Sequence, residues 1–426
     1  MTEPTAGPGA PPRTKLDVAT AVARVTAGVS RLGTEQLAPA DARGQVLAAA
    51  VLSTVALPPW NNSGMDGYAV RAADVAEVPT RLTVLETIAA GAFPAHRVDA
   101  GQATRIMTGA PIPDGADSVI RVEDTDGGRD SVEIRANRDA GKNVRARGED
   151  ITIGGEALPA GVTIGAAQLG VLAAIGTQLV EVFRRPRVAI LTSGDELVPP
   201  ERFREAATGR KIVSSNSVTL AELVRESGGE PIDLGIAADT RESIREHLAE
   251  AAGADLIITS GGISVGEFDY MREVIAELGG SLDFWRVRMR PGAPIGFGTL
   301  GGTPWIGLPG NPVSTMVTFE LFARPAIRKM RGHDALFRST VTVTLDEPVR
   351  LAANLTHYLR AVVTRHEGGR LTARLTGPQS SGVLSSMARA NVLLIVPQGA
   401  IEMNAGEILR AIPLGPDAGY SAVFGA

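Results

Sequence analysis

The sequence predicts a multidomain protein built around an α/β domain, with further domains rich in β-strands. At 426 residues the chain is too long for a single hydrophobic core. Between residues 187 and 332, short apolar runs alternate with amphipathic stretches, which is typical of a parallel sheet joined by right-handed crossover helices. Residues 80–135 and 334–426 instead hold short β-rich runs separated by glycine-containing turns.

The α/β segment has four expected strands and four expected helices. The apolar runs predict strands at 188–192, 232–236, 256–258 and 305–308. Helical spacing predicts helices at 216–226, 240–251, 270–278 and 314–330.

The remaining elements follow from apolar runs and from the helical spacing of apolar residues. Leu16–Leu32 predicts a helix that ends at Gly33, 40–57 is expected to be part helix and part strand, and 165–176 is a second helix. The stretch 57–71 is expected to be too irregular for a regular element, although it contains Trp60, Met65 and Tyr68. Expected strands are 82–88, 104–107, 118–122, 131–134, 341–345, 358–365, 371–375 and 392–397.

Composition excludes several classes of chemistry. The chain has no cysteine, so thiolate catalysis, disulfides and cysteine metal sites are excluded, and its 5 histidines are scattered. The net charge of −5 argues against broad nucleic-acid binding. No apolar run approaches the roughly 18 residues of a membrane span, and the Pro- and Gly-rich residues 1–13 are expected to be a disordered tail, so we expect a cytoplasmic protein.

The stretch Asp255–Tyr270 is the strongest local signal. Its strand ends abruptly at Ser260-Gly261-Gly262, and a helix is expected to begin near Asp269. A strand, a glycine-rich turn and a helix start form an anion site in an open α/β sheet, although a plain tight turn gives the same pattern. Two further strand ends carry Ser193-Gly194-Asp195-Glu196 and Pro309-Gly310-Asn311-Pro312-Val313-Ser314, and together they would line one crevice.

Each polar candidate also has a structural alternative. Asp66 fits a turn and Thr108 a strand end, while Asp150 lies in a charged cluster typical of a surface. Asp239 and Asp269 each precede a helix and fit N-caps.

Seven motifs in this order resemble one family, the molybdopterin molybdenumtransferases, known as MoeA, whose animal relative is gephyrin. They span the chain from about residue 16 to its end. The motifs are 62–71, 105–111, 148–151, 193–197, 260–270, 308–314 and 384–391.

The resemblance implies an elongated homodimer whose sites are shared between subunits, and four domains. They are a three-layer α/β/α domain with a mostly parallel sheet (14–31 and 184–333), a mixed linking domain (32–53 and 147–183), an inserted β domain (54–146) and a C-terminal β-barrel-like domain (334–426).

The resemblance also implies a reaction and a set of site residues. Molybdenum from molybdate is inserted into adenylylated molybdopterin with Mg²⁺ or a similar divalent ion, and AMP leaves. The implied catalytic residues are Asp66, Glu196, Asp239 and Asp269, of which the last three are also the implied metal ligands. The implied substrate-binding residues are Thr108, Asp150, Ser193, Gly194, Ser260, Gly261, Gly262, Ser264, Pro309, Gly310, Asn311, Pro312 and Ser314.

One motif departs from the family. Arg290, Arg360 and Ser381 are the implied molybdate residues, but the family's Lys-Pro-Gly-Lys reads Arg290-Pro291-Gly292-Ala293 here. The second cation is therefore lost, and arginine differs from lysine in geometry. Weaker molybdate binding or a tungstate preference would follow, unless Arg286 or Arg288 compensates.

Three other functions compete with the enzyme. A scaffold protein is disfavoured because the sequence has no long linker, and an upstream adenylyltransferase would need neither the 65–68 loop nor the C-terminal domain. A non-catalytic relative is disfavoured by the retained acidic residues. An adenylyltransferase and acceptor molybdoenzymes are expected as possible partners.

Overall fold

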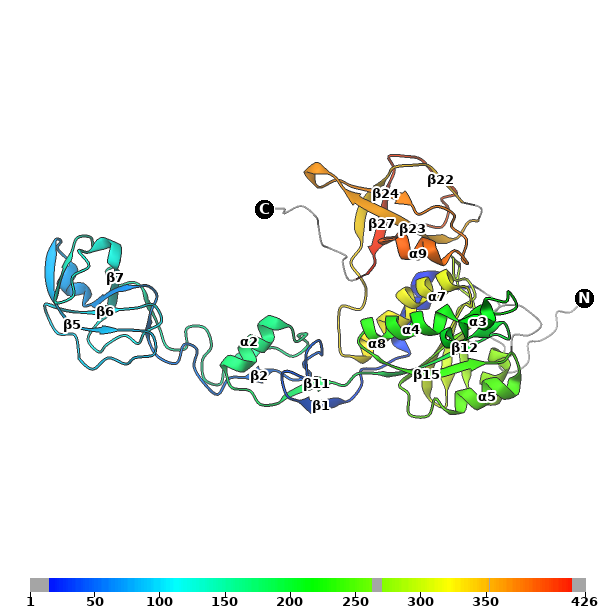
Figure 1. The fold of residues 1–426 in the computed structure, drawn as a ribbon, viewed down its shortest axis with the longest axis horizontal. Coiled ribbons are helices and arrows are strands. Elements are labelled where there is room, and N and C mark those ends of the chain that lie inside the picture. Colours follow the sequence, from blue (N-terminus) through cyan, green and yellow to red (C-terminus); the bar gives the residue numbers. More distant parts are fainter. Residues whose placement is uncertain (1–14, 263–269, 352, 416–426) are drawn as a thin grey trace, which may run out of the picture. The chain divides into compact units, whose positions relative to one another are not determined.

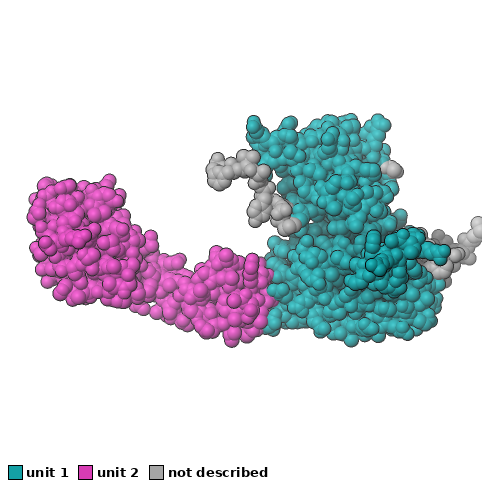
Figure 2. Space-filling model, in the orientation of Figure 1, with its two compact units in different colours: residues 1–35, 183–426 teal, residues 36–182 magenta. Residues whose placement is uncertain are grey.

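The computed structural model describes residues 15–262, 270–351 and 353–415. The predicted tail and two predicted site residues, Ser264 and Asp269, lie outside these ranges. The chain divides into two compact units, which are residues 1–35 with 183–426, and residues 36–182 (Figure 2). The finer division into four domains stays a prediction.

The first unit contains a six-stranded mixed sheet. Its strand order is β15 (Glu230–Ala237), β12 (Arg187–Ser193), β16 (Leu256–Ser260), β20 (Thr303–Leu308), β19 (Gly296–Leu300) and β17 (Ser281–Phe284). The four predicted strands are confirmed and run parallel. The sequence did not predict the last two: β19 runs antiparallel to β20, and β17 pairs antiparallel with β19.

Helices cover both faces of this sheet, which confirms the three-layer arrangement (Figure 1). Side chains alternate along β12: Val188 and Ile190 face one helical layer, and Ala189 and Leu191 face the other. The first layer contains α1 (Val18–Ala27), α4 (Ser215–Glu226), α7 (Pro312–Thr318) and α8 (Arg324–Met330), and the second contains α5 (Arg241–Ala249) and α6 (Met271–Glu277).

The single helix predicted at 314–330 is interrupted. A π-helix at Phe319–Ala323 separates α7 from α8. Its side chains Phe319 and Phe322 are fully buried, so the change of helix type lies inside the core.

The C-terminal part of the first unit is a closed barrel of five strands. The ring is β23 (Thr356–Arg365), β24 (Leu371–Leu375), β21 (Val341–Leu345), β27 (Ile408–Pro413) and β25 (Val392–Val396), which pairs back to β23. Tyr358, Leu393 and Ile412 of the barrel belong to the same buried cluster as α1 and α7. This shared core joins the barrel to the α/β part.

Shorter elements complete the first unit. Strand β18 (Met289–Arg290) pairs with β23, and α9 (Leu384–Arg389) follows the barrel loop at 376–383. The other short elements are β13 (Leu197–Val198), α3 (Phe203–Ala206), β14 (Ile212–Val213), β22 (Val349–Arg350) and β26 (Glu402–Met403).

The second unit holds a five-stranded sheet. Its order is β7 (Ser118–Arg121), β4 (Gly67–Val70), β6 (Gln102–Ile106), β5 (Thr80–Ile88) and β8 (Ser131–Ile134). The expectation that 57–71 forms no regular element was wrong, because it contains β3 (Asn62–Ser63) and β4. Tyr68 in β4 is fully buried and donates its hydroxyl to the Gly128 carbonyl oxygen at 2.8 Å.

The helical part predicted within 40–57 was also wrong. Val46 and Leu47 form bridges to Thr163 and Val182, and β2 (Val51–Leu52) pairs with β10 (Glu156–Leu158). These pairings bury Leu47 against α2 (Ala166–Ala174), so tertiary packing overrides the helical preference of the Ala-rich sequence.

Candidate functional site

A large cavity opens at the carboxyl ends of the parallel strands in the first unit. Its volume is about 1100 Å³, and its lining includes the barrel loop and the segment 289–294. It brings together fifteen of the predicted site residues: Ser193, Gly194, Glu196, Asp239, Ser260, Gly261, Gly262, Arg290, Pro309, Gly310, Asn311, Pro312, Ser314, Arg360 and Ser381.

Strand register explains why residues so distant in sequence meet here. Thr192 pairs with Ser260, and Ser260 pairs with Leu308. The three strands therefore end level with one another, and their following turns share one edge of the sheet.

The turn after β16 requires glycine. Gly261 and Gly262 have φ values of +96° and +61°, which favour glycine. A Cβ atom on Gly261 would lie 2.5 Å from the Ser193 carbonyl oxygen. The absence of side chains lets the ends of β16 and β12 approach closely, as expected for a turn that presents backbone N–H groups to a ligand.

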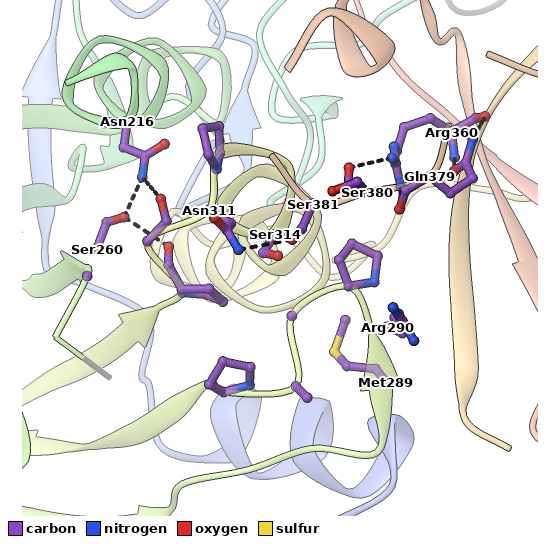
Figure 3. A pocket seen from close by; sticks show the side chains of 18 of the residues that line it. Asn216, Ser260, Met289, Arg290, Asn311, Ser314, Arg360, Gln379, Ser380 and Ser381 are labelled. Atoms are coloured by element: carbon purple, nitrogen blue, oxygen red, sulfur yellow. Dashed lines mark hydrogen bonds between the residues drawn. The ribbon is translucent and has the colours of Figure 1, made fainter. Parts of the chain in front are cut away.

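A hydrogen-bond network fixes the strand ends to α4 (Figure 3). Asn216 Nδ2 donates to Ser260 Oγ at 2.9 Å and to the Gly310 carbonyl oxygen at 2.7 Å. Ser260 Oγ donates to the Pro309 carbonyl oxygen at 3.0 Å. Sequence reasoning missed Asn216, although the run Ser214-Ser215-Asn216-Ser217 before an amphipathic helix was a visible signal.

A second link joins the barrel loop to α7. Asn311 Nδ2 donates to Ser381 Oγ at 3.0 Å, and the Val313 N–H donates to the Ser381 carbonyl oxygen at 3.2 Å. Ser314, one residue further, is buried at the cavity wall. The predicted residues of two sequence regions are therefore in direct contact.

Acidic side chains gather beside the turn after β12. The Asp239 N–H donates to Asp195 Oδ1 at 3.0 Å, and Glu196 also lines the cavity. Burial raises the pKa of Asp239, and the negative charges of Asp195 and Glu196 raise it further. Such a carboxylate cluster attracts a cation, and oxygen donors suit Mg²⁺.

The N-cap interpretation of Asp239 is not supported by the structure. Thr240 occupies the N-cap position of α5 and accepts the Ser243 N–H at 3.2 Å. The Asp239 carboxylate accepts the Asp195 N–H through Oδ2 at 3.4 Å, which leaves Oδ1 for a ligand. In the ranges that the structure covers, no three acidic or histidine side chains converge as a metal site, and the third predicted ligand, Asp269, lies outside those ranges.

Arg360 is the buried cation of the cavity wall. Its side chain is fully buried and uses four N–H groups. Nε donates to Ser386 Oγ at 3.0 Å, and the Nη atoms donate to the carbonyl oxygens of Pro378 (3.3 Å), Gln379 (3.2 Å) and Ser380 (2.9 Å). Figure 3 shows Arg360 beside Gln379 and Ser380. Burial lowers the pKa of Arg360 to about 10. One guanidinium hydrogen stays outside these four bonds.

The segment 289–294 supplies the second predicted cation. Arg290 is exposed at the cavity, and Ala293 lines it. Neither Arg286 nor Arg288, the suggested replacements for the missing lysine, belongs to the lining, whereas Arg350 does. Arg350 pairs with Glu402 at 2.9 Å, so its charge is shared with a carboxylate.

The other predicted residues lie in the second unit. Thr108 donates its N–H and its hydroxyl to Asp66 Oδ1 at 2.7 and 2.8 Å, and these bonds, the N–H first, lower the pKa of Asp66. Asp150 is exposed and donates its N–H to the Leu57 carbonyl oxygen at 3.0 Å. Asp66 and Thr108 thus form one polar pair.

Three family models match successive parts of the chain. Residues 16–176 match the MoeA N-terminal region (domain I and II), residues 189–329 a probable molybdopterin binding domain, and residues 342–414 the MoeA C-terminal region (domain IV).

Individual proteins match over most of the chain. A molybdopterin molybdenumtransferase of Nostoc sp. is 37% identical over 385 residues, covering 88% of this chain and 87% of the relative. Molybdopterin molybdenumtransferase 2 of Mycobacterium tuberculosis is 38% identical over 380 residues, covering 87% and 92%. The crystal structure of the molybdopterin biosynthesis MoeA protein from Pyrococcus horikoshii superposes with a TM-score of 0.80 at 27% identity, covering 94% of this chain and 100% of that one.

The three matched regions follow one another from residue 16 to residue 414. No helix in the described ranges is both long and apolar enough to cross a membrane. The chain belongs to the molybdopterin molybdenumtransferase (MoeA) family.

Proposed function

We propose that this protein transfers molybdenum from molybdate into adenylylated molybdopterin and releases AMP, as a step of molybdenum cofactor biosynthesis. The observation that carries the proposal is that acidic and basic side chains line different parts of one cavity. A carboxylate cluster and a glycine turn lie at one end, and the guanidinium groups of Arg290, Arg350 and Arg360 belong to the other parts of the wall.

The acidic end suits the bond that is cleaved. Breaking the phosphoanhydride that joins AMP to the pterin requires neutralisation of phosphate oxygens and a positioned substrate. Glu196 and Asp239 are the described carboxylates that would hold Mg²⁺, with Asp269 as the third predicted ligand. The metal would supply positive charge to the phosphate oxygens, while the turn at Gly261 and Gly262 orients them.

The cationic residues suit the incoming oxyanion. Molybdate is a tetrahedral dianion, which binds guanidinium and hydroxyl donors. Arg290 is exposed at the cavity, and Arg360 retains one hydrogen outside its four bonds. Ser381 Oγ, which accepts from Asn311, keeps its own hydrogen for an anion.

The decisive experiment is molybdate-dependent AMP release. Purified protein is mixed with adenylylated molybdopterin and Mg²⁺, with and without micromolar to millimolar molybdate. AMP release that saturates with molybdate supports the transferase. The half-saturating concentration measures how much molybdate affinity is lost because Ala293 replaces a lysine. Failure to bind the adenylate would refute the proposed function, and binding without release would refute the transfer step.

We further infer a homodimer in which Asp66, Thr108 and Asp150 of one subunit serve the cavity of the other. Mixing two inactive homodimers tests this arrangement. Asp66→Asn and Glu196→Gln homodimers that exchange subunits randomly should regain about a quarter of wild-type activity, since half of the dimers then hold one intact site of two. If each site lies within one subunit, no activity returns on mixing.

A further inference from the structure

The N-terminus of α4 opens on the cavity without a side-chain cap. Ser214 occupies the N-cap position, yet its hydroxyl makes no capping hydrogen bond. Ser214, Ser215 and Asn216 all line the cavity. The first N–H groups of a helix have no intrahelical acceptor, so this terminus offers donors together with the positive end of the helix dipole.

Two buried hydroxyl groups accompany this helix terminus. Ser214 is 1% exposed and Ser193 is 6% exposed, and both line the cavity. Within the part of the chain that the structure covers, neither Oγ atom has a hydrogen-bond partner. Because an unpaired buried hydroxyl is unfavourable, the two groups are suited to a ligand that accepts hydrogen bonds.

The surrounding bonds hold this site in place. The Ser214 N–H donates to the Val198 carbonyl oxygen at 2.8 Å, and Ser217 Oγ donates to the Ser214 carbonyl oxygen at 3.0 Å. Asn216 ties the same turn of helix to the ends of β16 and β20, as described above. Ligand binding therefore requires no rearrangement of the helix terminus.

We propose that Ser214, Ser193 and the N-terminus of α4 bind a phosphoryl group of the adenylylated pterin. This inference rests on the proposed function. Phosphoryl oxygens accept hydrogen bonds from hydroxyl and N–H groups, and a helix N-terminus favours their negative charge. The site thereby offsets the repulsion that Glu196 and Asp239 exert on the same ligand.

The geometry favours a phosphoryl group over molybdate. Figure 3 shows Asn216 and Ser260 on one side of the α7 residues Asn311 and Ser314, and Arg360 on the other. The α4 terminus and the buried guanidinium therefore belong to different parts of the cavity. A substrate with its phosphate at one end and an oxyanion at the other would use both.

Calorimetric titration of the full-length protein with AMP, in the presence of Mg²⁺, tests the assignment. Ser214→Ala should weaken AMP binding roughly 10- to 100-fold, the value of one hydrogen bond to a charged group. Thr219→Ala is the matched control, because Thr219 lies on the same helix but does not line the cavity. Its AMP affinity should equal that of the wild type.

A second variant separates binding from folding. Ser214→Asp places a good N-cap residue at the helix start, so the melting temperature should hold or rise, while its carboxylate repels a phosphoryl group. AMP binding should fall about 100-fold or more. A parallel titration with molybdate should give the same affinity for Ser214→Ala as for the wild type.

Several results would overturn the inference. The first is an AMP affinity equal to that of the wild type in folded Ser214→Ala and Ser214→Asp. The second is weakened molybdate binding with unchanged AMP binding in Ser214→Ala. The third is absence of AMP binding by the wild type. The first of these, with molybdate-dependent AMP release intact in the wild type, would refute this assignment alone. Normal AMP binding without AMP release would instead refute the proposed function.

Discussion

Replacing Arg360 by lysine should loosen the barrel loop that carries the predicted molybdate residue Ser381. The guanidinium group donates four hydrogen bonds to Ser386 Oγ and to three consecutive carbonyl groups, at 2.9–3.3 Å. Lysine keeps the charge but has three hydrogens on a single nitrogen, so at least one acceptor loses its donor. At about 1.5–3 kcal/mol for each bond to a charged group, losing one or two costs about 2–6 kcal/mol.

Hydrogen exchange measures this loss locally. The amides of Thr376 and Val313 report on the loop, since they donate to the carbonyl oxygens of Arg360 and Ser381. The protection of these two amides from exchange should fall in Arg360→Lys, and the half-saturating molybdate concentration for AMP release should rise. Arg365→Lys, an exposed arginine on the same strand, is the control and should leave both unchanged. Protection in Arg360→Lys equal to that of the control would refute the role of the buried guanidinium.

Three further changes test other parts of the site. Because burial and the neighbouring carboxylates raise the pKa of Asp239, the folded state loses stability as the pH rises above the unfolded pKa. Asp239→Asn should therefore have a higher unfolding free energy than the wild type at pH 7, measured by denaturant titration. This difference should vanish below about pH 4. An unfolding free energy of Asp239→Asn below that of the wild type at pH 7 would contradict this. Ala293→Lys restores a cation at the cavity and should lower the half-saturating molybdate concentration about tenfold, whereas Ala388→Lys, at an exposed position of α9, should not. Equal half-saturating concentrations in the two variants would contradict the cost assigned to Ala293. Thr108→Val removes the 2.8 Å hydroxyl bond to Asp66, so the pKa of that carboxyl, followed by NMR, should rise toward its usual value; an unchanged pKa would refute the role of this bond.

The strand ends of the α/β part were predictable from sequence because their signal is local. An apolar run such as Leu256–Ile258, followed by threonine, serine and two glycines, defines a buried strand and a tight turn without tertiary information. Strands β19 and β17, at one end of the sheet, gave no such signal, since they pair antiparallel and Gly296–Leu300 is short and glycine-containing. The irregular motif around Asp66 hid β4, whose Tyr68 becomes a core residue only through tertiary pairing.

The site was predictable in its residues but not in their contacts. Sequence motifs identified Arg360 and Ser381 through a resemblance, whereas the burial of Arg360 under three carbonyl groups depends on the fold of the barrel loop. Asn216 was missed because its two acceptors, Ser260 and Gly310, are distant in sequence. Long-range hydrogen bonds of this kind depend on the register of the sheet, which local patterns do not encode.

The interrupted sequence of the first unit has a consequence for synthesis on the ribosome. Helix α1 and the residue Val29 after it contribute to a core whose other fully buried members lie beyond residue 187, so this helix emerges long before its partners. The intervening residues 36–182 have buried clusters of their own and can fold before the partners of α1 are synthesised. We expect nascent chains that stop shortly after residue 182 to expose the apolar face of α1 and to bind chaperones there.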